Sequence, residues 1–255
     1  MLQYRWKGSV TMLLYYIRHG DPIYTPDSLT EQGEKQAEAL SKRLADVDFD
    51  RIYVSTSNRA YLTAKPTLEK CGKEPIMTDW LNEKVAGSYF WLDKMWIYQN
   101  DEYIKILNSE SMLDLGRRWS EHECFDGTKV REGEKFFAEK IAELFRDLGY
   151  EHDAKNGCFH RTENISSDSE DSGVSDERRI GIFAHGGAGK IFLSTVLGIP
   201  YPLFCTHFDL SHSSMSIVYF DEKKETVYPK LLQFSNDSHL YREGLPLRYN
   251  NGVKI

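Results

Sequence analysis

Two short segments of the sequence each place a histidine directly before a glycine at the end of an apolar run. The first, YYIRHG, contains Arg18 and His19, and the second, IFAHGG, contains His185 and Gly186. One histidine in such a place is usually a hydrogen-bonded structural residue, but two in the same context indicate a shared role. Arg59, in the segment VSTSNRA, follows a third apolar run and adds a second guanidinium group.

Gathered around one point, these side chains would suit a phosphoryl group. Arginine offers a forked set of donors that matches phosphate oxygens, and glycine lets the backbone approach closely. A neutral imidazole held in line with a phosphorus atom can displace an alcohol and form a phosphohistidine, which water then hydrolyses. The residues alone therefore predict a phosphate-binding pocket that contains a potential nucleophile.

The segments that carry these residues are predicted to be strands of one sheet. Short apolar runs alternate with amphipathic helical segments, which is typical of an α/β fold with a mostly parallel sheet and helices on both faces. Parallel strands end at the same edge of a sheet, where ligands bind, so His19 and His185 would meet if their strands are neighbours. The predicted strands are residues 13–17, 51–54, 75–78, 179–184, 214–220 and 230–234.

The predicted helices carry signals of their own. Thr30 is the expected N-cap of a helix over residues 31–47, and Pro66 is expected to disturb a helix over residues 57–71. A long helix is predicted over residues 134–148 from the spacing of its apolar side chains. These helices would connect parallel strands across the faces of the sheet.

Residues 80–132 break this alternation and hold four of the five tryptophans. A small helical subdomain with its own aromatic core would explain them. A cap over the end of the sheet, lending aromatic walls to a pocket, would also explain them, and the two interpretations are compatible. We therefore expect a helical, aromatic-rich cap insertion. The tryptophans are Trp80, Trp91, Trp96 and Trp119.

We expect residues 1–255 to form a single domain, with residues 80–132 as its cap insertion. Residues 150–178 are expected to be a flexible loop or hairpin. Within them, residues 163–177 hold five serines and six acidic residues, and too little apolar area to offset the entropy lost on ordering. A phosphorylated regulatory loop is the alternative interpretation of this acidic, serine-rich segment.

The composition narrows the classes of function. A net charge of −7 argues against a general nucleic-acid binder, which would need a basic face. The four cysteines are widely spaced and form no CxxC pair, so neither a disulfide framework nor a zinc cluster is expected. No stretch approaches the roughly 20 apolar residues of a membrane helix, so a cytoplasmic protein with no membrane partner is expected. Met12 is an alternative start to Met1, because residues 1–11 show no periodicity.

Five segments, in order along the chain, resemble the histidine phosphatase superfamily in its phosphoglycerate mutase-like branch. The RHG triplet alone is weak evidence, whereas five ordered segments that cover most of the chain are specific. The resemblance implies the α/β fold of that branch and a reaction on phosphate that uses no cofactor and no metal ion. The segments are RHG at residues 18–20, LTEQGEKQA at 29–37, VSTSNRAYLTA at 54–64, LNE at 81–83 and AHGG at 184–187.

The resemblance also implies roles for the residues at the strand ends. It makes His19 the nucleophile that becomes phosphorylated, with His185 as a second catalytic residue. Contacts to the phosphoryl oxygens would strengthen in the transition state and lower the barrier. The residues implied to bind these oxygens are Arg18, Arg59, His185 and Gly186. The expected partner is a small phosphorylated molecule.

A proton donor for the leaving group is implied after the third strand. The family usually draws this proton from a carboxyl group, for which the segment DWLNE offers Glu83, with Asp79 in reserve. Burial beside aromatic residues would help to keep such a carboxyl group protonated near neutral pH. An exposed capping charge is the alternative interpretation of Glu83.

Two departures from the family pattern favour hydrolysis over phosphoryl shuttling. Asp21 follows the triplet where many members carry a small or amide residue, and its carboxylate would repel a phosphate dianion unless it points away. The loop DPIYTPDS does not resemble the longer loop of the mutases. We therefore expect a phosphatase that hydrolyses a phosphomonoester. A mutase-type phosphotransferase and a non-catalytic phospholigand-binding protein are the alternatives.

Three of the six histidines outside these motifs are His207, His212 and His239. The HxxxxH spacing of the first two is not typical of residues that face one metal ion, so structural or pocket-lining roles are expected. The sequence indicates neither the identity of the substrate nor an oligomeric state.

Overall fold

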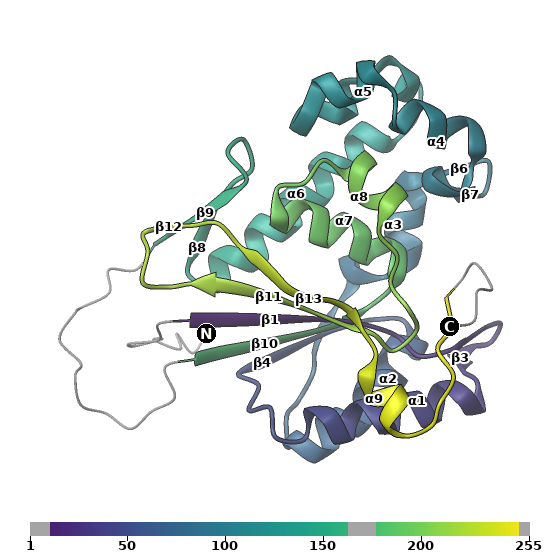
Figure 1. Cartoon of the computed structure of the whole chain (residues 1–255), viewed down its shortest axis with the longest axis vertical. Helices are drawn as coiled ribbons and strands as arrows, with labels where there is room; N and C mark the ends of the chain where they lie inside the picture. Colours follow the sequence, from purple (N-terminus) through teal and green to yellow (C-terminus); the bar gives the residue numbers. More distant parts are fainter. Residues whose placement is uncertain (1–10, 163–176, 250–255) are drawn as a thin grey trace.

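A six-stranded sheet forms the centre of the molecule (Figure 1). The structure is a computed structural model and describes residues 11–162 and 177–249. Four neighbouring strands pair in parallel, and β11 runs antiparallel to both of its neighbours, so the predicted mostly parallel sheet is confirmed. Each of the six predicted strands is present. Their order is β13 (Lys230–Asn236), β11 (Met215–Asp221), β1 (Thr11–Arg18), β10 (Glu177–Ala184), β4 (Arg51–Ser55) and β5 (Ile76–Thr78).

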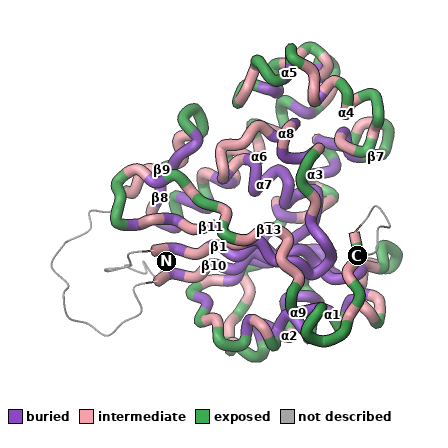
Figure 2. Tube along the Cα trace, viewed as in Figure 1, coloured by how far each residue is buried: buried purple, intermediate pink, exposed green. Residues whose placement is uncertain are grey.

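Helices pack on both faces of the sheet, as predicted (Figure 1). The helices α1 (Glu31–Leu44), α2 (Asn58–Cys71) and α9 (Ser238–Arg242) lie on one face. The helices α6 (Val130–Asp147) and α7 (Gly186–Leu197) lie on the other. Figure 2 shows that α7 is buried along nearly its whole length, because the cap covers the side that faces away from the sheet.

Burial on both faces of β1 explains the apolar run over residues 13–17. Leu14 and Tyr16 are fully buried in a cluster that includes side chains of α6 and α7. Tyr15 and Ile17 point to the opposite face and pack in a second cluster with side chains of α1 and α2. A strand that is buried on both faces reads as a continuous apolar run, without polar alternation.

The helices confirm one sequence signal and overturn another. The Thr30 hydroxyl caps α1 by accepting a hydrogen bond from the amide of Gly33 at 3.0 Å. The prediction that Pro66 disturbs the next helix is wrong, because α2 is unbroken from Asn58 to Cys71. Proline removes one backbone donor, and the buried face of α2, which packs on the sheet, outweighs that loss.

The cap insertion is a series of short helices and one hairpin that lies over α7 and α8 (Figure 1). The rings of Phe90 and Trp119 lie 5.2 and 5.3 Å from the ring of Tyr201 in α8. The aromatic core of the cap is therefore shared with the rest of the molecule. The elements are η1 (Asp79–Leu81), α3 (Glu83–Phe90), β6 (Trp91–Leu92), β7 (Met95–Trp96), η2 (Ile97–Gln99), α4 (Asp101–Leu107), α5 (Glu110–Leu115), η3 (Gly116–Glu121), η4 (Glu123–Phe125) and, as the support, α8 (Tyr201–His207).

Two hairpins complete the fold. One, β2 (Pro22–Tyr24) with β3 (Asp27–Leu29), follows β1 directly. The other, β8 (Tyr150–Asp153) with β9 (Cys158–Arg161), pairs with β12 (Thr226–Val227). The acidic, serine-rich segment lies outside the described residues except for its last residue. Across residues 11–162 and 177–249, no helix has both the length and the apolar character needed to span a bilayer.

Stability is expected to fall in mild acid because of a buried histidine. Burial, and then the charge of Arg43, lowers the pKa of His239 to about 4. The unfolded chain takes up this proton below about pH 6.5, whereas the folded protein does not until about pH 4. Stability from this group is therefore present above pH 6.5 and decreases as the pH falls. Between pH 7 and pH 5 we expect the free energy of unfolding to drop by about 2 kcal/mol from His239.

Urea unfolding of the wild type and of His239→Gln at both pH values measures this effect. The variant should lose about 2 kcal/mol less than the wild type between pH 7 and pH 5, since glutamine does not titrate. The same pH dependence in both proteins would show that His239 is protonated in the folded state.

Candidate active site

The two histidine–glycine segments lie side by side at the carboxyl end of the sheet. In the parallel pair of β1 and β10, Arg18 is opposite Ala184, so the residues that follow, His19 and His185, come next to each other. Their ring centroids are 5.1 Å apart. Arg59, near the start of α2, joins them, because its Nη2 lies 3.2 Å from His185 Nδ1. The four predicted side chains are thus brought together, each no more than 6% exposed.

Hydrogen bonding determines which nitrogen of His19 carries the proton. Its Nδ1 lies 2.7 Å from the carbonyl oxygen of Gly20, and a carbonyl only accepts, so Nδ1 is the donor. The lone pair is then on Nε2. Burial, followed by the neighbouring histidine and arginine side chains, lowers the pKa of His19 well below its usual value. A neutral imidazole with a lone pair on Nε2 is the form that a nucleophile requires.

His185 is held by contacts to its ring and to its backbone. Because arginine only donates, His185 Nδ1 accepts from Arg59, and Nε2 carries the proton and donates to Ser55 Oγ at 2.8 Å. The Tyr16 hydroxyl donates to the His185 carbonyl at 2.9 Å. Burial, and then the charges of Arg59 and Arg18, lowers the pKa of His185 well below its usual value. The ring is therefore fixed and neutral, and the two arginines supply the positive charge.

Asp27, in the β2–β3 hairpin, orients Arg59. Its Oδ1 accepts a hydrogen bond from Arg59 Nη1 at 2.7 Å. Its Oδ2 accepts from the Ser57 hydroxyl and from the amide of Asn58, both at 2.8 Å, so the same carboxylate satisfies the first turn of α2. Burial raises the pKa of Asp27, but the hydrogen bonds from Arg59 and Ser57 outweigh it and hold the pKa below its usual value. Asp27 therefore stays ionised and keeps the guanidinium in place.

Glu83 lies at the start of α3 with its carboxyl group against the first turn of α7. Its oxygens accept hydrogen bonds from the amides of Gly187 and Ala188 at 3.0 and 3.4 Å, and Oε2 lies 3.9 Å from His185 Nδ1. The side chain is 16% exposed. Burial raises the pKa of Glu83, against the opposing effect of these amides and of Arg59. Part of its population is therefore protonated at a pH where an exposed glutamate is fully ionised.

Two glycines at the start of α7 allow close contacts. A Cβ atom at Gly186 would lie 3.2 Å from Arg18 Nε, and one at Gly187 would lie 2.1 Å from the ring of Trp96. The second distance is too short for any side chain, so Trp96 reaches this place only because residue 187 is glycine. Since Trp96 belongs to the cap, this contact seats the cap on the helix that follows His185.

Asp21 points away from the predicted phosphate site, which removes the expected repulsion. One of its oxygens lies 3.2 Å from His212 Nδ1. The other accepts a hydrogen bond from the Thr30 hydroxyl at 2.8 Å and lies 3.5 Å from Arg248 Nη1. The ring of His212 in turn stacks on that of His19, with centroids 5.9 Å apart. The Asp21 carboxylate therefore lies against two basic side chains, His212 and Arg248.

The assembled side chains border a cavity of about 240 Å³. Glu83 lines it, whereas Asp79 is exposed and accepts a hydrogen bond from the amide of Trp80 at 2.7 Å. His185 is fully buried and is not a lining residue. The lining residues are Arg18, His19, Tyr24, Arg59, Glu83, Trp91, Lys94, Met95, Trp96, Gln99 and Gly186.

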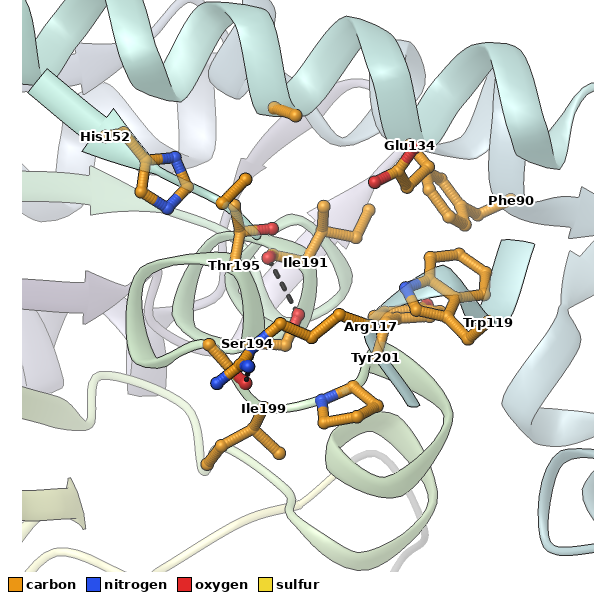
Figure 3. A pocket seen from close by; sticks show the side chains of 14 residues that line it. Phe90, Arg117, Trp119, Glu134, His152, Ile191, Ser194, Thr195, Ile199 and Tyr201 are labelled. Atoms are coloured by element: carbon orange, nitrogen blue, oxygen red, sulfur yellow. Dashed lines mark hydrogen bonds between the residues drawn. The ribbon is translucent and has the colours of Figure 1, made fainter. Parts of the chain in front are cut away.

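A second cavity, shown in Figure 3, lies against later turns of α7, at Ile191, Ser194 and Thr195, and has a volume of about 60 Å³. The side chains of Phe90, Trp119 and Tyr201 line one end of it, and His152 lies at the opposite end. None of the predicted site residues lines this cavity. The chemistry predicted from the sequence therefore concerns the cavity at the carboxyl end of the sheet.

His207 and His239 have the structural or lining roles that were predicted for them. His207 lines a neighbouring cavity, and its Nε2 lies 2.9 Å from Asn108 Oδ1 in the cap. His239 is buried, with Nε2 3.0 Å from the Ser213 hydroxyl.

Sequence reasoning missed several residues of the site. Ser55 follows the predicted strand over residues 51–54, as Arg59 does, so the rule that selected Arg59 could also have selected Ser55. Asp27 and the contact between His212 and His19 had no local signal, since both depend on segments that are distant in the sequence. The cap residues Trp91 and Met95 were not separable from the aromatic core by sequence pattern.

Comparison with known proteins agrees with this geometry. Residues 14–135 match the family model described as the histidine phosphatase superfamily (branch 1). The chain is 34% identical over 86 residues to a Schizosaccharomyces pombe protein named "Probable phosphatase C1687.21". That match covers 30% of this chain and 41% of the yeast protein, so the chain aligns with less than half the length of this relative.

Solved structures share the fold over most of the chain. A mycobacterial glucosyl-3-phosphoglycerate phosphatase, solved with VO3, superposes with a TM-score of 0.55 at 18% identity, covering 87% of this chain and 98% of that one. The phosphoserine phosphatase of Entamoeba histolytica superposes with a TM-score of 0.53 at 21% identity, covering 90% and 99%. These similarities confirm the predicted fold.

Proposed function

We propose that this chain, whose residues 14–135 match the histidine phosphatase superfamily (branch 1), hydrolyses a phosphomonoester through a phosphohistidine on His19, without a metal ion. The observation that carries this proposal is the state of His19. Its ring is buried and neutral, has its lone pair on Nε2, and lies in a cavity that two arginines line. The predicted roles of Arg18, Arg59, His185, Gly186 and Glu83 belong to the same proposal.

In the first step, His19 Nε2 attacks the phosphorus atom and the bond from phosphorus to the leaving oxygen breaks. Protonated Glu83 donates its proton to that oxygen, so the product leaves as an alcohol. Arg18 and Arg59 bind the phosphoryl oxygens and counter the charge that develops on them. The phosphorylated ring is cationic, and its Nδ1–H bond to the Gly20 carbonyl stabilises that charge.

In the second step, water attacks the phosphohistidine. The Glu83 carboxylate takes a proton from this water, the bond from phosphorus to Nε2 breaks, and inorganic phosphate leaves. Glu83 is then protonated again and His19 recovers its lone pair, so the cycle closes with one water consumed for each phosphate released.

The mouth of the cavity favours substrates with an aromatic or apolar leaving group. Tyr24, Trp91 and Met95 line the cavity and are 64%, 43% and 41% exposed. Large apolar side chains with this much exposure contribute little to the core, but they can cover a ligand. Lys94, between the two cap strands, adds a positive charge at the same mouth.

We expect Trp91→Ala to weaken binding of aromatic substrates selectively. Loss of one aromatic contact is worth about 0.5–1.5 kcal/mol, so KM for an aryl phosphate should rise about 2- to 10-fold. KM for phosphoserine, which has no apolar leaving group, should change little. Leu113→Ala is the matched control, because Leu113 is an exposed cap residue that does not line the cavity. Equal effects of Trp91→Ala on the KM of both substrates would argue against recognition of an aromatic leaving group by Trp91.

Release of phosphate from p-nitrophenyl phosphate, between pH 5 and pH 7 and with EDTA present, tests the proposed function. Turnover that persists with the chelator supports the metal-free hydrolase. No turnover by the folded wild type, combined with phosphoryl exchange that needs a bisphosphate primer, would indicate a mutase-type phosphotransferase. Binding of phosphate esters with neither activity would indicate a phospholigand-binding protein.

A further inference from the structure

The β8–β9 hairpin gathers three side chains that are common metal ligands. Asp153 and Cys158 are directly opposite each other across the hairpin, and His160, two residues after Cys158, shares their face. One ligand atom from each lies within 4.8 Å of the other two. Figure 1 shows the hairpin beside the amino-terminal ends of β1 and β10, whereas His19 directly follows the carboxyl-terminal residue of β1.

The separations are close to those of a tetrahedral zinc site. His160 Nε2 lies 3.5 Å from Asp153 Oδ2 and 4.0 Å from Cys158 Sγ. With zinc–ligand bonds of about 2.0–2.3 Å, a tetrahedron separates nitrogen from oxygen by about 3.4 Å and nitrogen from sulfur by about 3.6 Å. Side-chain shifts of a few tenths of an ångström would bring these two pairs to the bonded geometry.

The surroundings of His160 suit a metal ligand. Its Nδ1 lies 3.2 Å from the Thr226 hydroxyl, which can accept a hydrogen bond from the protonated Nδ1. The lone pair of His160 is then on Nε2, which faces the cluster. Asp153 is held by the turn, since Asn156 donates to both of its oxygens, at 3.0 and 2.7 Å. The Cys158 side is buried, whereas the His160 side chain is 44% exposed, so an ion can enter from solvent.

We propose that Asp153, Cys158 and His160 bind a single Zn²⁺ ion. A sulfur, nitrogen and oxygen donor set suits zinc and excludes Mg²⁺ and Ca²⁺, which take oxygen ligands. Water, or the carboxylate of Glu151 from the same face of β8, completes the tetrahedron. The spacing of the cysteines did not indicate this site, because only one cysteine belongs to it. The other two ligands are an aspartate and a histidine, which a search for CxxC pairs does not consider.

The ion would stabilise the β8–β9 hairpin and would take no part in the proposed phosphatase reaction. On binding, the Cys158 thiol loses its proton to solvent and its sulfur bonds to the metal, so affinity should rise with pH. Three ligands from both strands would lock the turn between β8 and β9. Ligand binding to the folded state alone raises the melting temperature.

Titration of the full-length, metal-free protein with Co²⁺ tests the proposal, because a cobalt–thiolate bond gives a charge-transfer absorption in the near ultraviolet. We expect this band to saturate at one equivalent and to disappear when Zn²⁺ is added. Cys158→Ser should abolish the band, and Cys71→Ser, a matched change in α2, should leave it intact. Thr226→Val should weaken Co²⁺ affinity about 10-fold or more, because it removes the partner of His160 Nδ1.

Three results would overturn the proposal: no thiolate band in the folded wild type, a band that survives in Cys158→Ser, or Co²⁺ affinity that His160→Asn leaves unchanged. His160 is half-exposed, so its replacement keeps the test valid if Cys158→Ser does not fold. Phosphate release is read separately in the presence of EDTA, so failure of the metal site and failure of the hydrolase are distinguishable.

Discussion

His19→Ala is expected to lower kcat for p-nitrophenyl phosphate by roughly 10⁴-fold or more, the scale of losing a catalytic nucleophile. The reason is that His19 Nε2 forms the bond to phosphorus, and no other neutral imidazole lines the cavity within the described residues. Alanine also removes the phosphohistidine itself. Reactions stopped with alkali should therefore show alkali-stable, acid-labile phosphate on the wild-type protein and none on the variant.

His122→Ala is the control for this experiment, since His122 lies in the cap and does not line the cavity. It should keep wild-type kcat and the phosphorylated intermediate. Circular dichroism of His19→Ala should match the wild type, because residue 19 follows β1 and its backbone hydrogen bonds do not involve the ring. Retention of even a tenth of the activity by His19→Ala would contradict the assignment of the nucleophile.

Glu83→Gln is expected to produce the second-largest effect, which depends on the leaving group. General acid catalysis contributes about 10²- to 10⁴-fold, and glutamine cannot donate the proton. The loss should be largest for alkyl phosphates such as phosphoserine, whose alkoxide needs a proton. It should be smaller for p-nitrophenyl phosphate, whose phenolate leaves readily. Steady-state kcat on both substrates measures the difference.

The pH profile gives a second measurement of Glu83. Activity requires neutral His19, whose pKa is lowered, and protonated Glu83, whose pKa is raised. The rate with an alkyl phosphate should therefore fall in strong acid as His19 gains a proton, and fall toward alkaline pH as Glu83 loses its proton. Glu83→Gln should remove the alkaline fall. Asp79→Asn, at the reserve position, should change neither limb, and an alkaline fall that follows Asp79 would reverse the assignment.

The sheet and the meeting of the two histidines could be predicted because their causes are local. Burial of β1 and β10 on both faces leaves continuous apolar runs, and the geometry of parallel strands then places the residues after each run at one edge. The N-cap at Thr30 is also local, since its hydroxyl reaches an amide only three residues away. Patterns of this kind can be recognised in the sequence without knowledge of the tertiary structure.

The errors and omissions share a different physical origin. α2 continues through Pro66 because tertiary packing of its buried face outweighs a local helix penalty. The pairing of Asp27 with Arg59, and of Asp21 with His212, joins residues that are about 30 and about 190 positions apart. No local sequence pattern indicates such partners. The orientation of the Arg59 guanidinium and the direction of the Asp21 carboxylate therefore became known only from the fold.

The place of β1 in the sheet has a consequence for how the chain is made. β1 is synthesised first, but its two neighbours are residues 177–184 and 215–221. A nascent chain that has emerged through the family-matched region carries His19 on an apolar strand with both edges unpaired. Such a strand is prone to associate with other chains until β10 and β11 have left the ribosome. Translation through β11 is therefore a condition for a competent active site, and chaperone protection of β1 would have its greatest value before that point.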